Sequence, residues 1–448
     1  MTRPIPAPKP VPGTGTDAMW LLYELLYVIG LLLYLPKAVW RRRLPHAGWT
    51  MRLGRYPATV VEALGGRRAI WVHAVSVGEV LAARPLLGAL RQAAPDEPMA
   101  LSTITPSGFA MAERHVGDGG VPVYFPLDLR LCVARALEVL RPRLLLLMES
   151  ELWPTAIRLA AARGVPVAVI NGRLSPHSFA RYRLALARPW VRSMLGQVAL
   201  FLMQSQVDAD RILQLGAAAD RVRVVGSLKW DASLLARPDA ETVRQLAGRL
   251  GLGGREVVLV AGSTHRGEER AVLGALQPLR DSRVEARAVI APRHLERLDE
   301  VEQLAREAGF TVARLSQADG AGRWQVGLVD TWGQLPLYYG LASVVFIGGS
   351  LIPHGGQNPL EAASLGKPVV FGPSMYNFEA IAHQLLAHRA ARQVGSGKEL
   401  SRALAELSLD EAGAQAMGQR AQALTEQFQG ATHRTLEALR PFLPIKAQ

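Results

Sequence analysis

Cysteine and charged residues are scarce in this sequence. A single cysteine, Cys132, occurs among 448 residues, which excludes a disulfide scaffold and a zinc site built from cysteines. Charged residues make up 20% and hydrophobic residues 49% of the chain, with a mean hydropathy of +0.12, so a disordered chain and a coiled coil are also excluded. The length and apolar content instead fit two ordinary globular domains.

Acidic residues are few relative to basic residues. The chain has 51 Lys and Arg against 38 Asp and Glu, a formal net charge of +13. This excess predicts an anionic partner, which could be a phosphorylated ligand, an acidic membrane surface or a nucleic acid. The net charge alone does not choose among these three.

The N-terminal region combines a polar lead-in with a hydrophobic run. Residues 2–16 are rich in proline and glycine and predict a disordered lead-in. Residues 18–35 carry one charge, Glu24, and a helix of this length, at ~1.5 Å per residue, nearly spans the ~30 Å core of a bilayer. Basic residues follow between 37 and 43, which predicts an uncleaved membrane anchor or an interfacial helix with its C-terminal side in the cytoplasm. A cleaved signal peptide and a buried core helix are the competing interpretations.

Short runs rich in β-branched residues alternate with longer amphipathic stretches in the rest of the chain. Such alternation predicts parallel sheets covered by helices on both faces, and a polar stretch near 231–254 divides it into two similar α/β halves. The predicted strands are 69–74, 99–103, 121–124, 144–148, 167–170, 199–203 and 222–225, then 257–261, 286–291, 326–329, 344–347 and 369–371. Such sheets bind ligands beyond the carboxyl ends of their strands, where we therefore expect the site residues.

The first predicted strand leads into Ser76 and Glu79, at the start of a predicted helix. A carboxylate in this place suits a general base. The spacing Ser-x-x-Glu is equally that of a capping box, in which Glu79 would only satisfy the helix N-terminus. Residues 74–78 also differ by one position from the Gly-x-Ser-x-Gly nucleophile elbow, which keeps open a serine hydrolase that uses Ser76.

Two carboxylates, Glu149 and Glu151, follow the apolar run 144–148 at its carboxyl end. For Glu151 we favour stabilisation of the helix that begins near Pro154 over catalysis. After the next strand, Arg173 adds a basic group that can bind phosphate or carboxylate.

In the second half, Ser263, Thr264 and His265 follow a strand and begin a helix, whose free backbone N–H groups favour an anion. Further on, a glycine-containing loop leads to Asn358 and Glu361. Asparagine followed by proline marks a helix start, and glycine lets the backbone approach a ligand closely. Glu361 either completes the cap of this helix or accepts hydrogen bonds from ribose hydroxyls, and the two roles can coexist.

Eight segments in one order resemble the bacterial family of 3-deoxy-D-manno-octulosonic acid (Kdo) transferases, and the resemblance runs from about Trp20 to the C-terminus. The segments are 72–79, 149–154, 226–231, 263–265, 292–294, 330–331, 355–361 and 372–378. Their common order is more specific than any single segment.

The resemblance implies an α/β protein of two Rossmann-like domains facing a central cleft, the GT-B glycosyltransferase architecture, with an N-terminal membrane helix. We expect a disordered lead-in at 1–17, an anchor helix and basic flank at 18–43, an acceptor-binding domain at 44–228, an interdomain linker at 229–254 and a CMP-sugar-binding domain with C-terminal helices at 255–448.

The resemblance also implies a reaction, the inverting transfer of Kdo from CMP-Kdo to the lipid A precursor in lipopolysaccharide core biosynthesis. Glu79 matches the general base of the family, and Glu149 and Lys229 match positions that support the transition state. The implied CMP-binding residues are Pro292, Arg293, Trp332, Gly333, Gln334, Asn358, Pro359, Leu360 and Glu361. Possible donor or acceptor contacts are Ser263, Thr264, His265, Arg173, Gly355 and Gly356.

The chain departs from the family pattern at three positions. Trp332 and Gln334 stand where the family has Met and Glu, and Trp230 stands where it has Phe. A nucleotide contact through the backbone of this segment would survive the change, whereas a side-chain role of the family's Glu would not.

No cofactor and no metal are expected, because CMP leaves as a phosphate monoester that a helix N-terminus and an arginine can stabilise. The expected partners are CMP-Kdo, the lipid A precursor and anionic inner-membrane lipid, without nucleic acid. A location on the cytoplasmic side of the cell inner membrane, with a single N-terminal anchor, gives the charge and the hydrophobic run one explanation. Two further functions stay open, a GT-B enzyme that uses another nucleotide sugar and a non-enzymatic module that binds acidic lipid.

Overall fold

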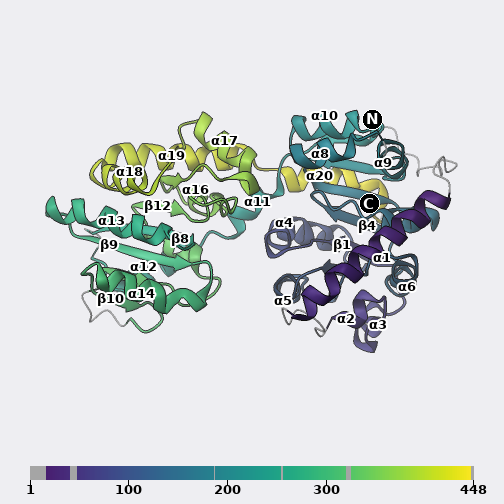
Figure 1. Ribbon diagram of the computed structural model, residues 1–448, viewed down its shortest axis with the longest axis horizontal. Coiled ribbons are helices and arrows are strands. Elements are labelled where there is room, and N and C mark those ends of the chain that lie inside the picture. Colours follow the sequence, from purple (N-terminus) through teal and green to yellow (C-terminus); the bar gives the residue numbers. More distant parts are fainter. Residues whose placement is uncertain (1–16, 41–47, 186, 254–255, 319–323, 445–448) are drawn as a thin grey trace. The chain divides into compact units, whose positions relative to one another are not determined.

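The computed structural model describes residues 17–40, 48–185, 187–253, 256–318 and 324–444, and the predicted lead-in at 2–16 and basic residues 41–43 lie outside them. The chain forms two compact units (Figure 1). Unit 1 takes in the chain up to Ala232 and again from Gln429, and unit 2 takes in 233–428. Within the described residues, each unit contains one seven-stranded sheet.

The sheet of unit 1 is parallel throughout and has the strand order β3-β2-β1-β4-β5-β6-β7. Its strands are β1 (Ile70–His73), β2 (Met99–Thr103), β3 (Val121–Tyr124), β4 (Leu144–Met148), β5 (Val167–Gly172), β6 (Leu200–Met203) and β7 (Val222–Val224). The order changes direction between β1 and β4. This is the topological switch point of a doubly wound sheet, where such folds bind ligands.

Alternate residues of these strands enter cores on opposite faces of the sheet, as the pleat of a strand requires. Trp71 and Leu145 lie in one buried cluster with side chains of α3, α6, α7, α9 and α10, whereas Val72 and Leu146 lie in another with side chains of α4, α5 and α20. The helices of unit 1 are α1 (Asp17–Trp40), α2 (Trp49–Arg52), α3 (Ala58–Leu64), α4 (Val77–Ala93), α5 (Pro106–His115), α6 (Arg130–Leu140), α7 (Pro154–Ala162), α8 (Pro176–Tyr182), α9 (Arg188–Leu195), α10 (Gln206–Gln214) and α20 (Ala431–Leu439), and α11 (Leu228–Leu235) crosses the unit boundary.

Helix α1 confirms the helix predicted at 18–35 and packs against the rest of unit 1. The Tyr23 hydroxyl donates to Asp128 Oδ2 (2.8 Å), and the backbone N–H of Arg130 donates to Glu24 Oε1 (2.8 Å). The Trp20 ring packs against Trp190, with 6.1 Å between ring centroids. The exposed large hydrophobic residues of α1 are Leu21, Leu22, Leu25, Leu26, Val28, Ile29, Leu32 and Leu33.

A membrane-spanning helix, one of the forms that the sequence predicts for this segment beside an interfacial helix, is not found among the described residues. Across the described ranges of the chain, none of the helices combines the length and the apolar content that crossing a membrane requires. The residues of α1 that contact unit 1 include Tyr23 and Glu24, whose polar groups are hydrogen-bonded there.

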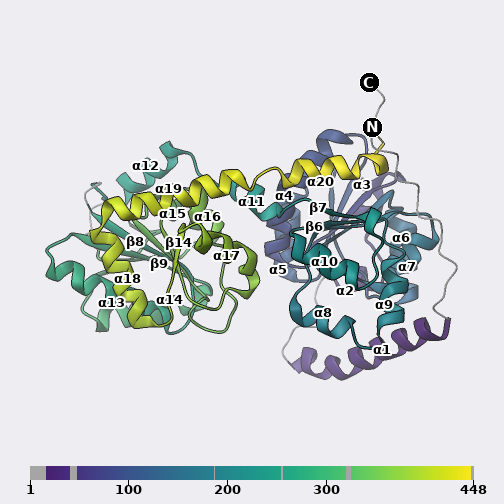
Figure 2. The same cartoon turned by 90° about the horizontal axis from the view of Figure 1, so that it is seen from above.

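The C-terminal helix α20 belongs to unit 1, which differs from the expected domain 255–448. It packs against α4 (Figure 2), and Ala431, Ala438 and Leu439 enter the unit 1 core. Asp231 accepts hydrogen bonds from the backbone N–H groups of Gly430 (2.8 Å) and Thr432 (2.6 Å). The end of the chain therefore returns to complete the first unit.

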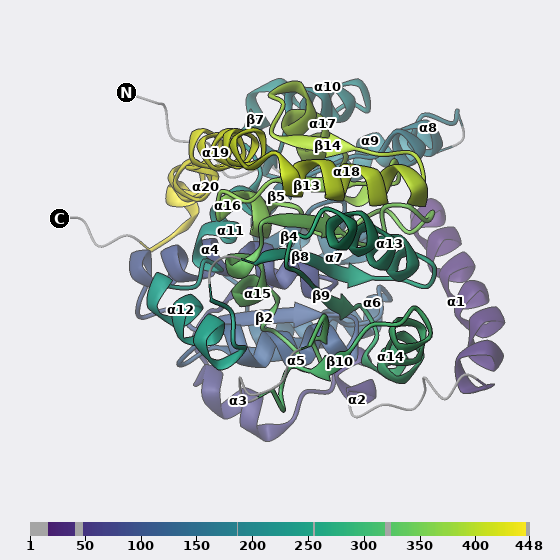
Figure 3. The same cartoon turned by 90° about the vertical axis from the view of Figure 1, so that its left-hand side faces the viewer.

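The sheet of unit 2 is also parallel throughout, with the order β10-β11-β9-β8-β12-β13-β14. Its strands are β8 (Val257–Thr264), β9 (Ala286–Pro292), β10 (Val312–Arg314), β11 (Val326–Leu328), β12 (Val344–Ile347), β13 (Val369–Phe371) and β14 (Ala391–Gln393). Its helices are α12 (Ala240–Arg249), α13 (Glu268–Asp281), α14 (Leu298–Glu307), α15 (Leu335–Leu341), α16 (Leu360–Ser364), α17 (Glu379–Ala387), α18 (Gly397–Leu409) and α19 (Glu411–Gln427). Helices α13 and α18 pack side by side over one face of this sheet (Figure 3).

All twelve predicted strands are present, and the structure adds β10 and β14. Both added strands are three residues long and lie at the two edges of the unit 2 sheet. The stretch expected as a linker, 229–254, contains most of α11 and all of α12. The two parallel sheets confirm the α/β class of the prediction.

Candidate active site

The switch point of unit 1 brings Glu79 and Glu149 to one edge of the sheet. Glu79 lies in the first turn of α4, directly after β1, and Glu149 directly follows β4. Because β1 and β4 are adjacent and parallel, their carboxyl ends meet at the same edge. The charge of Glu149 accordingly acts on Glu79.

Glu79 is half-buried and held by its own loop. The backbone N–H of Val75 donates to Glu79 Oε2 (3.0 Å), and the Ser76 hydroxyl donates to Oε1 (3.2 Å). Burial first, and then the charge of Glu149, raise the pKa of Glu79 to about 8. A carboxyl group with such a pKa can both take up and release a proton near neutral pH, as a general base must.

The surroundings of Ser76 do not fit the nucleophile of a serine hydrolase. Its hydroxyl donates to the Glu79 carboxylate. His73, which is nearby in the sequence, turns its Nδ1 to the Ser102 hydroxyl (3.0 Å) and stacks on Phe125. Burial lowers the pKa of His73 to about 3, so this side chain is a neutral part of the core.

Lys229 and Glu149 form an ion pair at this edge, with 2.8 Å between Lys229 Nζ and Glu149 Oε1. The side chains are 13% and 15% exposed. Glu149 has a φ of +54°, in the left-handed region that few non-glycine residues adopt. Strain of this kind collects at functional sites, and here it places a carboxylate beside Lys229. The structure thus brings together the two residues expected to support the transition state.

Asn171, at the carboxyl end of β5, connects these groups. Its Oδ1 accepts hydrogen bonds from the Leu228 N–H (2.9 Å) and the Ser227 hydroxyl (3.3 Å). Its Nδ2 donates to Glu149 Oε1 (3.4 Å). Asn171 is fully buried and has a φ of +50°, so it positions both Glu149 and the start of α11, which carries Lys229. The sequence does not reveal this role; its one signal is asparagine followed by glycine at a strand end.

Glu151 and Arg173 are further polar residues of this region. Burial raises the pKa of Glu151 to about 7, and the charge of Glu151 also raises the pKa of Glu79. Arg173 directly follows β5 and is half-buried. The carboxyl edge of unit 1 therefore combines several carboxyl groups with basic side chains.

The switch point of unit 2 lies between β8 and β12. β8 is three residues longer than predicted, so Ser263 and Thr264 belong to the strand and His265 is the first residue beyond it. The backbone N–H of Arg293, directly after β9, donates to the Thr264 carbonyl (2.9 Å). Residues expected to bind the donor thus begin two neighbouring loops.

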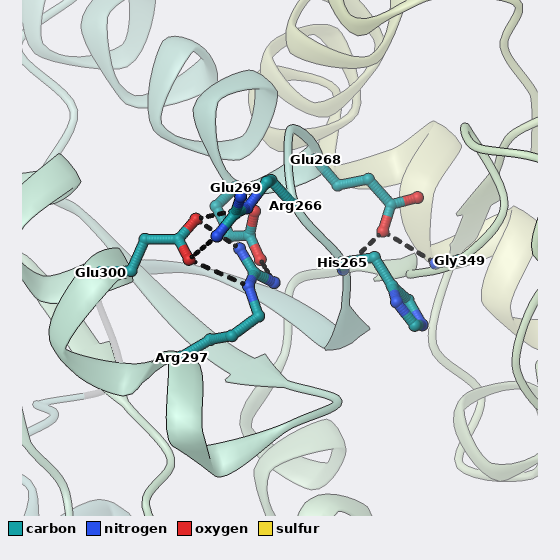
Figure 4. Close-up of polar contacts among 7 residues, drawn as sticks. All are labelled: His265, Arg266, Glu268, Glu269, Arg297, Glu300 and Gly349. Carbon is teal, nitrogen blue, oxygen red and sulfur yellow. Dashed lines mark hydrogen bonds and ion pairs between the residues drawn. The ribbon is translucent and has the colours of Figure 1, made fainter. Parts of the chain in front are cut away.

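Glu268, in the first turn of α13, joins the loops that follow β8 and β12 (Figure 4). Its Oε2 accepts from the N–H groups of His265 (2.9 Å) and Gly349 (2.8 Å). Its Oε1 accepts from the N–H groups of Ser350 (3.1 Å) and Leu351 (3.0 Å). Glu268 is 1% exposed; burial raises its pKa, and the four amides satisfy both carboxylate oxygens.

A network of charged side chains lies beside Glu268 (Figure 4). Arg297 donates to the buried Glu269 (2.7 Å) and to Glu300 (3.2 Å). Arg266 makes two hydrogen bonds to Glu300, at 2.7 and 3.1 Å. Hydrogen bonds from Arg266 and Arg297 hold the pKa of Glu300 at about 2. The network connects the segment after β9 to the start of α13.

Asn358 and Glu361 make the cap contact that the sequence predicts. Asn358 Nδ2 donates to Glu361 Oε1 (3.3 Å), and Asn358 Oδ1 accepts from the Leu360 N–H (3.1 Å). Helix α16 begins at Leu360, so Pro359 precedes the first helical residue instead of being it. Burial raises the pKa of Glu361 to about 7. Its contact with ribose remains a prediction.

Trp332, Gly333 and Gln334 lie in the turn before α15. The Trp332 side chain is 63% exposed. The Thr331 hydroxyl donates to Gln334 Oε1 (3.0 Å), so the Gln334 amide is engaged within its own turn. Of the two residues that depart from the family pattern here, Trp332 is therefore exposed and Gln334 makes a hydrogen bond within its own turn.

Gly355 and Gly356 are required by the packing of the loop after β12. Their φ angles are +95° and +70°. A Cβ atom on Gly355 would lie 2.4 Å from Asn377 Nδ2, and one on Gly356 would lie 2.2 Å from Met375 Sδ. The backbone conformation and the packing of this loop therefore explain glycine at both positions without any contact to a ligand.

Metal-binding geometry is not seen in the ranges that the structure describes, where no cluster of three or more His, Cys, Asp or Glu side chains could hold a metal ion. Pro292 ends β9 and Leu360 begins α16, and neither carries a ligand group. The expectation that the reaction needs no metal remains a prediction.

Comparison with known proteins relates most of the chain to one family. The family described as 3-Deoxy-D-manno-octulosonic-acid transferase (kdotransferase) matches residues 47–232. The 3-deoxy-D-manno-octulosonic acid transferase of Bordetella pertussis is 36% identical over 420 residues, which cover 90% of this chain and 95% of the relative. The Haemophilus influenzae protein of the same name is 31% identical over 379 residues, which cover 84% and 87%.

Solved structures match the fold. A UDP-GlcNAc 2-epimerase from Neisseria meningitidis, bound to UDP-GlcNAc, covers 83% of this chain and 99% of its own with a TM-score of 0.58 and 16% identity. At this identity the likeness concerns the fold alone. It supports a GT-B-like arrangement of two Rossmann-like units.

Proposed function

Because the chain belongs to the Kdo transferase family, it is a glycosyltransferase that transfers Kdo from CMP-Kdo, and we propose its acceptor, catalytic groups and location. The acceptor is the lipid A precursor, and the transfer inverts the anomeric centre. The observation that carries this proposal is the grouping of Glu79 with the Glu149–Lys229 pair at the switch point of unit 1.

Glu79 is the general base of this mechanism. Its carboxylate takes the proton of an acceptor hydroxyl while the hydroxyl oxygen attacks the anomeric carbon of Kdo. The bond from that carbon to the CMP phosphate breaks, and CMP leaves with the bonding electron pair. The raised pKa of Glu79 supports this role, because the group then holds the acceptor proton near neutral pH.

Glu149 and Lys229 support the transition state together. Lys229 balances the charge of Glu149, which would otherwise repel the Glu79 carboxylate more strongly. Asn171 fixes the geometry of the pair through its contacts with Glu149 and the start of α11. Arg173, which follows β5 in the same unit, contributes a guanidinium that can bind a phosphate of the acceptor.

Unit 2 binds the CMP portion of the donor at the carboxyl edge of its sheet. The residues proposed for this site are Pro292, Arg293, Trp332, Gly333, Gln334, Asn358, Pro359, Leu360 and Glu361, with Ser263, Thr264, His265, Gly355 and Gly356 beside them. The hydrogen bond from the Arg293 N–H to the Thr264 carbonyl supports a shared site, because it joins two of these segments. The carboxyl group of Glu361 accepts a hydrogen bond from ribose in this proposal, and its raised pKa supports a partly desolvated site.

The protein acts at the cytoplasmic face of the inner membrane, where its acceptor lipid is anchored. The exposed leucines of α1 support contact with the acyl region of a leaflet, and the net charge of +13 supports attraction to anionic headgroups. The location therefore brings enzyme and lipid substrate to one surface.

Incubation of the purified protein with CMP-Kdo and tetraacylated lipid A precursor, with EDTA present, tests the proposal. Mass spectrometry of the lipid is expected to show the gain of one or more Kdo units, and their number gives the number of additions. Activity that is lost with EDTA and restored by a divalent cation would overturn the expectation of a metal-free reaction. If the mass of the lipid did not change although the protein still bound CMP, the assignment of the lipid A precursor as acceptor would be overturned.

A GT-B enzyme that uses another nucleotide sugar, the alternative that the sequence leaves open, is the second candidate; the likeness to an enzyme bound to UDP-GlcNAc concerns the fold alone and does not favour it. Calorimetric titration with CMP and with UDP separates the two. Tighter binding of CMP is expected, and tighter binding of UDP would favour the second candidate.

A further inference from the structure

Three histidines approach one another at the switch point of unit 2. His265 follows β8, His294 follows β9 and His354 lies in the loop after β12, and these three strands are neighbours in the sheet. The ring centroids of His265 and His354 are 4.1 Å apart, and those of His265 and His294 are 5.8 Å apart. Three distant segments thus place their imidazoles in one cluster.

The central histidine of the cluster is buried and lacks a partner. His265 is 8% exposed, and its Nε2 makes no hydrogen bond in the described part of the chain. His294 and His354 are exposed and flank it. A buried imidazole nitrogen without a partner costs free energy, and a hydrogen bond to a ligand would remove that cost.

The backbone around His265 is fixed tightly. Glu268 accepts its N–H and the N–H of Gly349 (Figure 4), which joins the loops that carry His265 and His354. A Cβ atom on Gly348 would lie 2.3 Å from the Ser263 carbonyl oxygen, so glycine lets the second loop approach the first. The backbone therefore holds together the two loops that carry His265 and His354.

The titratable and cationic groups that face His265 all lower its pKa. They come from His354 on the loop after β12, from His294 and Arg293 on the loop after β9, and from Arg297 at the end of the short helix η2 (Leu295–Arg297). The nearby carboxylates are engaged: Glu268 with four backbone amides and Glu269 with Arg297. Burial, and then these positive neighbours, lower the pKa of His265 to about 4.

We propose that this histidine cluster receives the phosphate of CMP and that His265 gains a proton when the nucleotide binds. The inference rests on the proposed binding of the donor by unit 2. The proton comes from solvent, goes to the free Nε2 of His265 and is then donated in a hydrogen bond to a phosphate oxygen. The negative charge offsets the positive neighbours, which favours the protonated imidazole.

Phosphate fits this place because its binding residues are adjacent in the chain. Arg293, a proposed CMP contact, immediately precedes His294, and Asn358 lies four residues after His354. Arg293 supplies a permanent positive charge, and the two exposed imidazoles supply further N–H donors. The cluster differs from a solvated basic surface because the Nε2 atom of its central residue, His265, is buried.

Calorimetry of CMP binding tests the inference. Titrations near pH 6.5, repeated in buffers of different ionisation enthalpy, count the protons taken up per CMP bound. Wild type is expected to take up about one more proton than His265→Gln. His383→Gln, an exposed histidine of α17, is the matched control and is expected to equal wild type. Cytidine, which lacks the phosphate, is expected to bind without this proton.

Equal proton counts for wild type and His265→Gln, with CMP bound by both, would overturn the histidine role and leave the donor site standing. Absence of CMP binding to folded wild type would overturn both. A second measurement needs no variant: the affinity of wild type for CMP is expected to rise from about pH 8 to about pH 6.5, by up to about tenfold per unit. If the affinity for CMP depended on pH no more than the affinity for cytidine does, the inference would also be overturned.

Discussion

The two units place polar groups at equivalent points of similar sheets, but the groups have opposite character. In unit 1 the switch point between β1 and β4 carries Glu79 and Glu149, with one lysine as partner. In unit 2 the switch point between β8 and β12 carries His265 and His354, with arginines nearby. The topology fixes where a site lies, whereas the side chains decide whether it handles a proton or an anion.

The largest effect is expected from removal of the acid–base group of unit 1. Glu79→Gln keeps the shape and the hydrogen bond from Val75 but cannot take the acceptor proton. The kcat of Kdo transfer, measured by mass spectrometry of the lipid, is expected to fall about a thousandfold. CMP affinity, a property of unit 2, is expected to stay unchanged.

Glu62→Gln, an exposed glutamate of α3 in the same unit, is the matched control and is expected to keep full activity. If Glu79→Gln kept at least a tenth of the wild-type kcat, Glu79 would not be the general base. The proposed division between a catalytic unit 1 and a nucleotide-binding unit 2 would then fail.

The next effect concerns the carboxylate that organises unit 2. Glu268→Gln replaces one acceptor oxygen by an N–H₂ group, so two of its four backbone amides lose their acceptor. The stability of unit 2 is expected to fall by about 3 kcal/mol, since buried donors without partners cost about 1–3 kcal/mol each. Hydrogen–deuterium exchange of residues 345–356, compared with the exposed-site variant Glu296→Gln, measures the loss. Unchanged protection would show that Glu268 does not hold these loops.

A smaller loss is expected at Asn171 in unit 1. Asn171→Ala removes the acceptor of the Leu228 N–H, which is expected to cost about 2 kcal/mol and to lower the thermal unfolding midpoint. Asn171→Asp keeps that acceptor but turns a carboxylate toward Glu149, so it is expected to retain more stability while kcat falls. Equal kcat in Asn171→Asp and wild type would contradict the positioning role.

The pH dependence of kcat follows from the raised pKa of Glu79. The base works in its charged form, and burial together with Glu149 favours the neutral form up to about pH 8. With saturating substrates, kcat is therefore expected to rise about tenfold per pH unit below pH 8 and to level off above it. A kcat that is constant from pH 6 to pH 8 would contradict this prediction.

The smallest effect is expected at the surface of unit 2. Arg266 and Glu300 form an ion pair whose side chains are 79% and 41% exposed, and Arg297 still contacts Glu300 when Arg266 is removed. Arg266→Ala is expected to change CMP affinity by less than about twofold, because exposed pairs are screened by solvent. A larger loss would extend the anion site beyond the histidine cluster.

Periodicity and strand ends were sufficient to predict most of the fold. The buried apolar runs of the central strands, such as 144–148, are unambiguous because both faces of a parallel sheet are covered. β10 and β14 escape prediction because their short sequences, Val-Ala-Arg and Ala-Arg-Gln, contain one β-branched residue between them, whereas the equally short edge strand β7 reads Val-Arg-Val. The return of α20 to unit 1 depends on a contact with Asp231, some two hundred residues away in sequence.

The site could be predicted only in part, for a related reason. Glu79 and Glu149 follow apolar runs, so sequence alone indicates them. The function of Glu268 depends on backbone amides more than eighty residues away, and the role of Asn171 depends on the start of α11. The histidine cluster likewise forms only when three loops meet, and single histidines in a sequence carry no such information.

The contact between Asp231 and Gly430 also shows how unit 2 is inserted into the chain of unit 1. Unit 2 is one uninterrupted segment, and the chain of unit 1 leaves at 232 and resumes at 429. The flanking residues are within hydrogen-bonding distance of each other, at 2.8 Å between the Gly430 nitrogen and Asp231 Oδ1. Unit 2 is therefore an insertion in unit 1, and one side chain of unit 1 bridges the two points at which the chain leaves and re-enters that unit.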